Sequence, residues 1–311
     1  MDIVCIGELL VDFLPAGMSE NSYPLFEFHP GGAPANVAAA IAKLGGSSAF
    51  IGKTGNDWPD QFLIQALAKC SVDVTGMIMD PHEKTSMSLV RLDDQGERSF
   101  CFFGDHPADL ALKPTEIKKE LLSNCRVLHF GARSLLSNSG KESIASAILL
   151  AKANGAVISF DPNIRPALWP NKDIARDDCL WGIEHADLVK LSTEEQQLIF
   201  GSESTAHVIK RLKDQEKQCV VTKGEEGAYV LNKSRIEHIS GFRVSAIDST
   251  GAGDAFWGAF LFATTYLSQI PIIEKVRMAC AAGALTTLKK GAIAAQPNLL
   301  DIQRLLNSHI S

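Results

Sequence analysis

The sequence lacks the features of several large protein classes. Its 311 residues contain no apolar run long enough to cross a bilayer and no long basic run, and the formal net charge is −6, so neither a membrane nor a nucleic acid is an expected partner. The seven cysteines are scattered, odd in number and without a C-x-x-C spacing, which argues against a disulfide framework or a zinc site and favours the cytoplasm. No internal repeat or low-complexity linker divides the chain. We therefore expect a single domain over residues 1–311.

Three enzyme signatures are also missing. The run Gly52-Lys53-Thr54 resembles the end of a Walker A motif, but the glycine required five residues before Gly52 is absent, because position 47 is serine. No G-x-G-x-x-G pattern follows a strand, and the eight histidines form no H-E-x-x-H motif. The sequence therefore argues against a P-loop, a Rossmann dinucleotide site and a zinc protease site of that kind.

Buried strands are the first positive signal. The apolar N-terminus is interrupted by Asp2, Glu8 and Asp12 and has no basic stretch before it, so we expect a first strand there and not a signal peptide. Nearly continuous apolar runs that end in glycine or a polar residue are typical of parallel strands buried on both faces. The runs are DIVCIG (2–7), RVLHFG (126–131), AVISFD (156–161), ADLVKL (186–191) and CVVTKG (219–224).

Helices are expected between these strands. Residues 34–46 start with Pro34 and have Gly45 at their end, and residues 140–155 close with Asn154 and Gly155, which is the usual punctuation of a helix. The alternation predicts βαβ units and an α/β fold with a doubly wound, mostly parallel sheet.

Two segments break the alternation. Residues 85–103 contain two strand-like runs around Asp93-Asp94-Gln95-Gly96, a hairpin signal with no helix after it. The segment 12–30 contains several helix-breaking prolines and a glycine. We expect these two pieces, roughly 12–30 and 85–107, to form a small sheet that stands off the main domain as a lid.

The run DSTGAGDAF, residues 248–256, precedes a long apolar segment. At a helix N-terminus, the backbone N–H groups of Gly251, Ala252 and Gly253 would form an anion hole for phosphate. A carboxylate beside phosphate needs a reason, and the natural one is that Asp254 removes a proton from an attacking hydroxyl. The alternative makes Asp254 an N-cap and the glycines a tight turn.

A second motif is HPGGAPANVAAAIAKLGG, residues 29–46. Gly31 and Gly32 would let a ligand approach the backbone closely, and the amide of Asn36 can donate and accept hydrogen bonds as a polyol requires. The alternative is a helix cap on a close-packed alanine face.

A third motif is FDPNIRP, residues 160–166, directly after a predicted strand. Ligands of open α/β sheets bind beyond the carboxyl ends of the strands, where Asp161, Asn163 and Arg165 are expected. Arg165 can neutralise charge on a transferring phosphoryl group. Asp161 has the alternative role of capping the turn at Pro162.

Together these motifs resemble those of the ribokinase-like, or PfkB, carbohydrate kinases. DSTGAGDAF is similar to the C-terminal signature of that family, and GGAPANVAAAIAKLGG followed by FIGKTGNDWPDQF is similar to its N-terminal signature. FDPNIRPALWP and DLVKLSTEE resemble the fructokinase branch. The resemblance covers nearly the whole chain and implies a three-layer α/β/α fold with a small β-sheet lid. It also implies an enzyme that uses ATP and Mg²⁺ to phosphorylate a ketohexose, in the first place fructose to fructose 6-phosphate.

The resemblance implies roles for single residues as well. Asp254 matches the family's general base, and Gly251, Ala252 and Gly253 match its anion hole. Residues that match sugar-binding positions, or could close over the sugar, are Asp12, Gly31, Gly32, Asn36, Phe102 and Arg165. Residues that match the ATP site are Lys190, Thr222, Lys223, Gly224, Gly227, Gly251, Gly253, Cys280 and Gly283.

The resemblance further implies metal sites and a partner. Glu195 matches the glutamate of an N-x-x-E motif that helps to organise Mg²⁺. Asp248, Thr250 and the backbone around Gly291 resemble a K⁺ site beside the anion hole. Members of the family often dimerise through their lids, so a homodimer is the implied assembly.

The chain departs from the family pattern at three points. Ser192 replaces the asparagine of N-x-x-E, and Cys280 replaces a frequent adenine-side asparagine. The end of the lid hairpin, CFFGDHPADL, has no arginine, whereas many fructokinases carry one there.

Two alternatives remain open at this stage. One is a kinase for ribose, a nucleoside or 2-keto-3-deoxygluconate, and a sugar acid would favour Arg91 or Arg98 facing its carboxylate. The other is an inactive family member that acts as a binding module, against which the intact Asp254, its flanking glycines and Arg165 argue.

Overall fold

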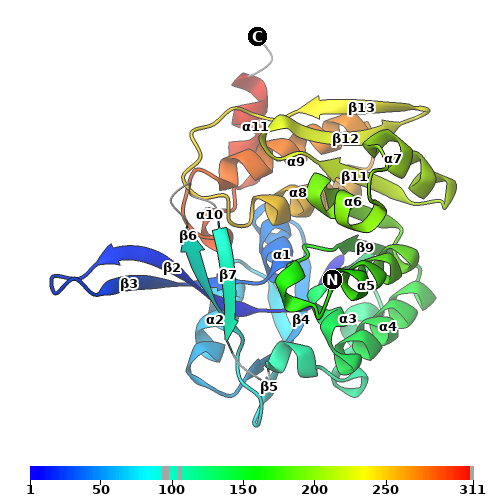
Figure 1. Ribbon diagram of the computed structural model, residues 1–311. Coiled ribbons are helices and arrows are strands. Elements are labelled where there is room, and N and C mark those ends of the chain that lie inside the picture. The colour runs from blue at the N-terminus through cyan, green and yellow to red at the C-terminus, as the bar shows by residue number, and fades with distance from the viewer. Residues whose placement is uncertain (93–97, 104–106, 309–311) are drawn as a thin grey trace.

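The computed structural model describes residues 1–92, 98–103 and 107–308, with the backbone alone at 91–92 and 98–100. Its main sheet has the strand order β13-β12-β11-β10-β9-β8-β1-β4-β5 (Figure 1). The seven strands from β11 to β5 in this order are parallel to one another. At the other edge, β12 pairs antiparallel with β11, and β13 pairs antiparallel with β12. The strands are β1 (Ile3–Ile6), β4 (Ser48–Gly55), β5 (Asp73–Asp80), β8 (Val127–Gly131), β9 (Val157–Asp161), β10 (Leu188–Ser192), β11 (Gln218–Thr222), β12 (Gly227–Asn232) and β13 (Arg235–Ser240).

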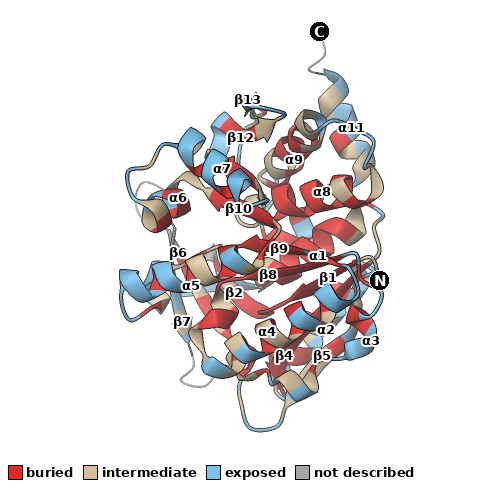
Figure 2. Ribbon diagram, turned by 90° about the vertical axis from the view of Figure 1, so that its right-hand side faces the viewer, coloured by how far each residue is buried: buried red, intermediate tan, exposed pale blue. Residues whose placement is uncertain are grey.

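Helices cover both faces of this sheet, so the predicted three-layer α/β/α fold is confirmed. Alternate residues of β1 divide between two cores: Ile3 and Cys5 pack in one, Val4 and Ile6 in the other. Figure 2 shows the buried strands between the two helical layers. No helix in the described part of the chain combines the length and apolar character needed to span a membrane. The first layer holds α1 (Ala33–Lys43), α2 (Trp58–Lys69), α8 (Ala252–Tyr266), α9 (Ile272–Thr286) and α11 (Leu299–Ser308), and the second holds α3 (Lys119–Leu122), α4 (Asn138–Ala153), α5 (Lys172–His185), α6 (Thr193–Phe200) and α7 (Thr205–Asp214).

The five strands expected from apolar runs are present as β1, β8, β9, β10 and β11, each within two residues of its predicted bounds. The helices expected at 34–46 and 140–155 are α1 and α4. The run Gly52-Lys53-Thr54, rejected as a nucleotide motif, lies inside the fully buried strand β4.

A separate four-stranded sheet has the order β3-β2-β6-β7. Its strands are β2 (Leu10–Met18), β3 (Pro24–Gly31), β6 (Met87–Leu92) and β7 (Arg98–Phe103), so both segments expected to form a small sheet contribute a hairpin. The predicted turn at 93–96, and residues 104–106 of the predicted lid segment, lie outside the described residues. The β2–β3 hairpin projects away from the body of the molecule (Figure 1). At its base, Phe28 contacts Phe13 and Trp58, with ring centroids 4.6 and 5.2 Å apart.

Candidate active site

A pocket of about 970 Å³ opens where the carboxyl ends of the parallel strands face the small sheet. Its wall comes from segments that follow β1, β8, β9 and β10, from the turn before α8, and from β7. The residues singled out from the sequence that line it are Asp12, Gly32, Asn36, Phe102, Arg165, Lys190, Glu195, Thr250, Gly251, Gly253 and Asp254.

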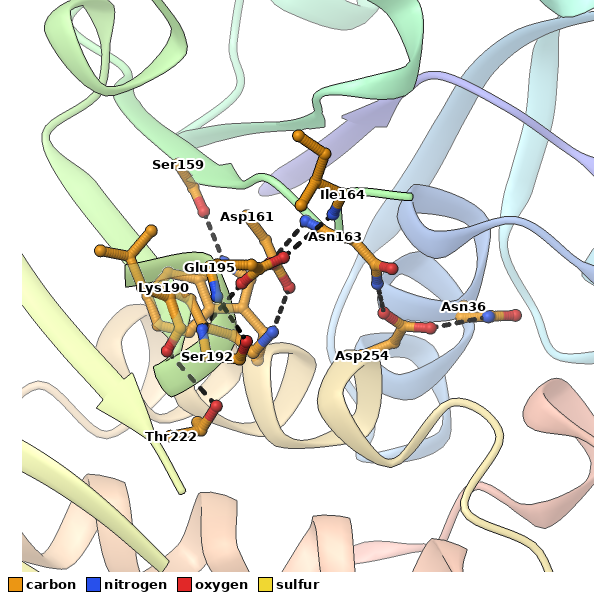
Figure 3. A network of polar contacts seen from close by, with 12 residues as sticks. Asn36, Ser159, Asp161, Asn163, Ile164, Lys190, Ser192, Glu195, Thr222 and Asp254 are labelled. Carbon is orange, nitrogen blue, oxygen red and sulfur yellow. Dashed lines mark hydrogen bonds and ion pairs between the residues drawn. The ribbon is translucent and has the colours of Figure 1, made fainter. Parts of the chain in front are cut away.

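Asp254 lies at the floor of this pocket and is held by two amides. Its Oδ2 accepts a hydrogen bond of 2.8 Å from Asn36 Nδ2, and its Oδ1 accepts one of 2.8 Å from Asn163 Nδ2 (Figure 3). These donors come from α1 and from the segment after β9, which lie 218 and 91 positions before Asp254 in the sequence. The side chain of Asp254 is therefore fixed in orientation while each oxygen keeps a further lone pair for a ligand.

Burial governs the charge of Asp254. The residue is 5% exposed, and burial raises the pKa of its carboxyl to about 6, against the lowering effect of the Asn36 hydrogen bond and of Lys190 and Arg165. A carboxyl group with a pKa just below neutrality is largely ionised at neutral pH and yet basic enough to take a proton.

The turn before α8 differs in detail from the expectation. Gly251 is the N-cap residue and adopts a left-handed backbone with φ 75°, whereas Gly253 lies in the first helical turn. No side chain caps this helix end, so the alternative in which Asp254 is the N-cap is wrong. A β-carbon on Gly251 would lie 2.7 Å from Cβ of Ala292, so a close approach also requires glycine there. The backbone N–H of Ala252 donates to the backbone oxygen of Ser249 at 3.2 Å, so a ligand at this end of α8 would rely first on the N–H groups of Gly251 and Gly253.

Lys190 brings a buried positive charge to the same turn. Its Nζ lies 3.4 Å from the position that a β-carbon on Gly253 would take, and it donates a 2.7 Å hydrogen bond to Oδ2 of Asp161. Burial by itself lowers the pKa of Lys190, but the charges of Asp161, Glu195 and Asp254 outweigh burial and raise it. Asp161 also accepts from the backbone N–H of Asn163 at 3.2 Å, so it combines the predicted turn-capping role with an ion pair.

Glu195 is tied to the backbone on both sides. Its Oε2 accepts from Ser192 N at 2.7 Å and its Oε1 from Ile164 N at 3.0 Å (Figure 3). The hydroxyl of Ser192 in turn caps α6 by accepting a 3.1 Å hydrogen bond from Glu195 N. Serine can therefore replace the asparagine of the N-x-x-E motif as the cap of this helix. Burial, followed by the charge of Asp161, raises the pKa of Glu195.

Glycines 31 and 32 are required by the protein's own packing. A β-carbon on Gly31 would lie 2.2 Å from Oδ2 of Asp12, and one on Gly32, where φ is 110°, would lie 2.3 Å from the backbone oxygen of Glu8. Gly32 lines the pocket, whereas Gly31 does not. Asp12 is buried and accepts a hydrogen bond from the hydroxyl of Ser88.

Phe102 and Arg133 form the side of the pocket nearest the lid. The guanidinium of Arg133 lies 4.9 Å from the centroid of the half-buried Phe102 ring. Its Nε donates to Oδ2 of Asp109 at 2.6 Å. Arg133 belongs to the short helix η3 (Arg133–Leu136), directly after β8.

Several residues expected in the ATP site lie outside the lining of this pocket. Lys223 pairs with Glu226 at 2.8 Å on the surface, and Cys280 is buried in α9. Gly283 packs against α8, where a β-carbon would lie 3.2 Å from the backbone oxygen of Ala252. The site residues expected from the sequence that do not line the pocket are Gly31, Thr222, Lys223, Gly224, Gly227, Asp248, Ala252, Cys280, Gly283 and Gly291.

Asp248 organises the loop beside the turn. Its Oδ1 accepts from the backbone N–H and the hydroxyl of Thr250, at 2.8 and 2.6 Å, and its Oδ2 accepts from Gly291 N at 2.8 Å. His29 of β3 packs against Gly291, where a β-carbon would lie 2.4 Å from the imidazole Nδ1. The small sheet thus contacts the segment at Gly291, which is hydrogen-bonded to Asp248 in the loop before α8.

Among the pocket residues to which the sequence assigns no role, three matter for the chemistry: Asn163, Glu8 and Arg133. The sequence indicates Asn163 only as a polar residue near a strand end. A positive φ of 42° at Asn163 follows from the Asp-Pro-Asn turn and aims its side chain at Asp254. Glu8 and Arg133 each come just after a buried strand, a position that could have marked them.

The described residues contain no cluster of three or more His, Cys, Asp or Glu side chains suited to hold a metal ion. All seven cysteines are free thiols, and five of them are buried.

Comparison with known proteins gives a consistent match. The model of the pfkB family of carbohydrate kinases matches residues 1–299. Fructokinase-2 of Zea mays is 38% identical over 313 residues, which cover 98% of this chain and 93% of the maize protein.

Solved structures agree with this match. Fructokinase from Xylella fastidiosa with bound ATP is 32% identical, with a TM-score of 0.90 over 100% of this chain and 99% of that one. Fructokinase from Vibrio cholerae O395 in a form with fructose, ADP and calcium is 36% identical, with a TM-score of 0.89 over 98% of each chain. A double mutant of the Vibrio protein with fructose, ADP and potassium is 35% identical, with a TM-score of 0.88 over 98% of each chain.

Proposed function

The chain belongs to the pfkB family of carbohydrate kinases, and from that premise we propose that it transfers the γ-phosphoryl group of ATP to fructose, forming fructose 6-phosphate. The observation that carries this proposal is the buried carboxylate of Asp254, held by Asn36 and Asn163 beside the open N-terminus of α8. An inactive binding module would have no use for an ionisable group at that place, because its burial costs free energy.

Asp254 is the general base in this proposal. A sugar hydroxyl donates a hydrogen bond to a free lone pair of the carboxylate and gives up its proton as its oxygen bonds to the γ-phosphorus. The bond from that phosphorus to the leaving ADP oxygen breaks in the same step. Because burial raises the pKa of Asp254 to about 6, the proton acceptor is available at neutral pH.

The turn and its neighbours stabilise the transferring group. Backbone N–H groups of Gly251 and Gly253 donate to phosphoryl oxygens, and Ala252 joins them by exchanging its bond to Ser249 O for one to the phosphoryl group. The partial positive charge of the α8 N-terminus adds to this stabilisation. Lys190, within reach of Gly253, and Arg165, which lines the pocket, supply full positive charges. Before ATP binds, the positive charge of Lys190 is offset by three nearby carboxylates, those of Asp161, Glu195 and Asp254.

Sugar and nucleotide occupy opposite ends of this arrangement. We assign the sugar hydroxyls to Asp12, Gly32 and Asn36, with Phe102 closing over the ring, and retain Gly31 as the residue that gives Asp12 its space. We assign the nucleotide base to the side of α9. Its proposed contacts are Thr222, Lys223, Gly224, Gly227, Cys280 and Gly283.

Mg²⁺ is the proposed divalent ion on the ATP phosphates. The donor set fits an ion that keeps most of its waters, because both oxygens of Glu195 already accept backbone N–H groups and Asp161 is paired with Lys190. When bound, the ion would neutralise negative charge on the ATP phosphates. Glu195 and Asp161 would hold its water ligands.

K⁺ is the proposed monovalent ion beside the turn, near Asp248, Thr250 and the backbone of Gly291. The hydrogen bonds that Asp248 accepts from Thr250 and Gly291 shape this loop, and a double mutant of the Vibrio relative has been solved with potassium. We expect a higher rate in potassium than in sodium or in a bulky organic cation at fixed ionic strength. Equal rates in the three salts would remove this assignment.

A cytoplasmic homodimer is the proposed working form. The free thiols suit a reducing compartment, and the exposed apolar side chains of the β2–β3 hairpin suit a second copy. Tyr23, in the turn of this hairpin, is the most exposed of these side chains at 68%.

The choice of acceptor is tested by a coupled ADP-release assay at saturating ATP and Mg²⁺. We expect kcat/KM for fructose to exceed that for ribose, glucose and 2-keto-3-deoxygluconate by at least about tenfold, or ~1.4 kcal/mol of transition-state stabilisation. We expect a difference of this size because a displacement of the reacting hydroxyl by about 1 Å can lower the rate ~100-fold. A higher kcat/KM for ribose, a nucleoside or the sugar acid would replace fructose and leave the sugar-kinase assignment in place. The side chains of Arg91 and Arg98, named for the sugar acid, lie outside the described residues.

A further inference from the structure

Two buried oxygens of the pocket have no hydrogen-bond donor among the described residues. They are Oε2 of Glu8 and Oδ1 of Asn36, whose side chains belong to residues 7% and 4% exposed. Both residues line the pocket. The other buried polar atoms without a partner belong to residues that do not line it: Thr54, Glu203, Thr264, Thr265 and Gln296. An unpartnered buried acceptor carries a free-energy penalty, so two of them in one pocket indicate donors supplied by a ligand.

The carboxylate of Glu8 is held in place from one side only. Its Oε1 accepts a 2.9 Å hydrogen bond from the backbone N–H of Ala33, the first residue of α1. Gly32 provides no side chain to cap this helix, and α1 has no acidic residue in its first turn, so Glu8 takes that role from the end of β1. The remaining oxygen, Oε2, therefore has a fixed position.

The charges around Glu8 select the kind of ligand group. Burial raises the pKa of Glu8 to about 7, while Arg133 opposes this rise. Near neutrality the group can accept a hydrogen bond as a carboxylate or donate one as an acid. A sugar hydroxyl that donates to the carboxylate form satisfies the unpartnered Oε2, whereas an anionic group would be repelled by that form.

The hydroxyl at Glu8 differs from the one that reacts. Asp254 receives the reacting hydroxyl in the proposed function. Glu8 is bound to the first residue of α1, Ala33, whereas Asp254 is bound to Asn36, three residues further along the same helix, so the two carboxylates are held at different points. Glu8 thus contacts the part of the acceptor that stays on the sugar.

We infer that Glu8 determines acceptor specificity, with Oε2 hydrogen-bonded to a non-reacting hydroxyl of the sugar. This inference rests on the proposed function as a sugar kinase, and it does not depend on fructose being the acceptor.

Glu8→Gln is the variant that isolates this contact. Glutamine keeps an oxygen for the Ala33 N–H, but the second position becomes an NH₂ that can only donate. We expect KM and the calorimetric Kd for fructose to rise at least about tenfold, kcat to change less than about threefold, and KM for ATP to stay within about twofold.

Asp187→Asn is the matched control. Asp187 also uses a carboxylate oxygen to hold a backbone N–H, that of Ile158 at 2.7 Å, and it does not line the pocket. It should leave KM and Kd for fructose unchanged. If Glu8→Gln fails to fold, as judged by its melting curve, Glu8→Asp keeps the charge and withdraws it by one methylene, and the same rise in KM and Kd is expected.

Deoxyfructose analogues identify the hydroxyl. Removing the one that contacts Glu8 should weaken binding to the wild-type protein at least about tenfold and to Glu8→Gln less than about threefold. An unchanged fructose Kd in Glu8→Gln, or equal losses for every analogue in both proteins, would overturn the inference and leave the kinase intact. If another sugar proves to be the acceptor, the proposal that fructose is the acceptor fails, and wild-type protein and Glu8→Gln are compared with that sugar instead. If no sugar of the panel binds, both proposals fail.

Discussion

At the scale of single residues, Asp254 shows what a local motif can and cannot reveal. Its role was predicted from the glycines before it and the apolar helix after it. Asn163 was not assigned as its partner, because the contact joins residues 91 positions apart and depends on the left-handed backbone at Asn163. The sequence does not reveal Glu8 either, because the proposed role of Glu8 depends on one buried oxygen without a partner, which only the folded structure shows.

The pKa of Asp254 predicts a cost in stability. A buried carboxyl whose pKa is raised to about 6 retains its proton in the folded state at pH values where the unfolded chain has lost it. The folded state therefore binds more protons between about pH 4 and 6, and stability falls as pH rises through that window. At pH 7.5 the ionised side chain costs on the order of 2–3 kcal/mol.

Asp254→Asn should consequently be more stable than the wild-type protein at pH 7.5, with a midpoint of melting a few degrees higher, and the gain should shrink toward pH 4. Thermal melts across this range measure it. Asp80→Asn is the opposite case, because Lys53 holds the pKa of Asp80 below its usual range, and this variant should be destabilised at pH 7.5. A stability gain for Asp254→Asn that does not change with pH would contradict the account.

At the scale of elements, the sequence predicts best where a segment is locally consistent. Strands β1, β8, β9, β10 and β11 carry uniform apolar runs and were found. Strand β4 was not named, because Lys53 and two glycines interrupt its apolar run. Lys53 is 2% exposed and is paired with Asp80 of β5 and with Glu116, partners that only the folded chain brings together.

The two glycines of the turn before α8 should respond differently to alanine. Gly251→Ala places a β-carbon at φ 75° and 2.7 Å from Ala292, so we expect a lower melting temperature. Gly253→Ala lies in the helix and meets only Lys190 at 3.4 Å, so we expect unchanged or higher stability with kcat/KM reduced at least about tenfold by crowding of the phosphate.

Melting curves and steady-state kinetics on both variants separate these effects. Full activity in Gly253→Ala would refute the anion hole, and an unchanged melting temperature in Gly251→Ala would refute the strained turn.

At the scale of the whole molecule, the resemblance supplied the three layers and the small sheet, and the structure has both. The sequence could not show how far the β2–β3 hairpin projects (Figure 1). Strand β3 is an edge of its sheet, and Leu25 and Phe26 on it are 45% and 37% exposed. An exposed apolar edge strand is a surface that favours association.

We expect the wild-type protein to have the mass of a dimer in light scattering after size-exclusion chromatography, and Phe26→Glu to shift it toward the monomer. Leu149→Glu is the control, because Leu149 is 72% exposed on α4, far from this hairpin in the sequence and in a different layer. A monomeric wild-type protein, or a dimer that only Leu149→Glu disrupts, would place the interface elsewhere or remove it.

The central claim is that the whole fold serves to hold one buried carboxylate against a sugar hydroxyl at the mouth of a phosphate-binding helix. Its most direct test is the kcat of Asp254→Asn with ATP and fructose, alongside the calorimetric affinity for ATP. We predict that kcat falls at least about 100-fold, the lower bound expected for loss of a general base, while the ATP affinity stays within about threefold. A variant that keeps more than about a tenth of the wild-type kcat, a loss of under ~1.4 kcal/mol, would contradict the claim.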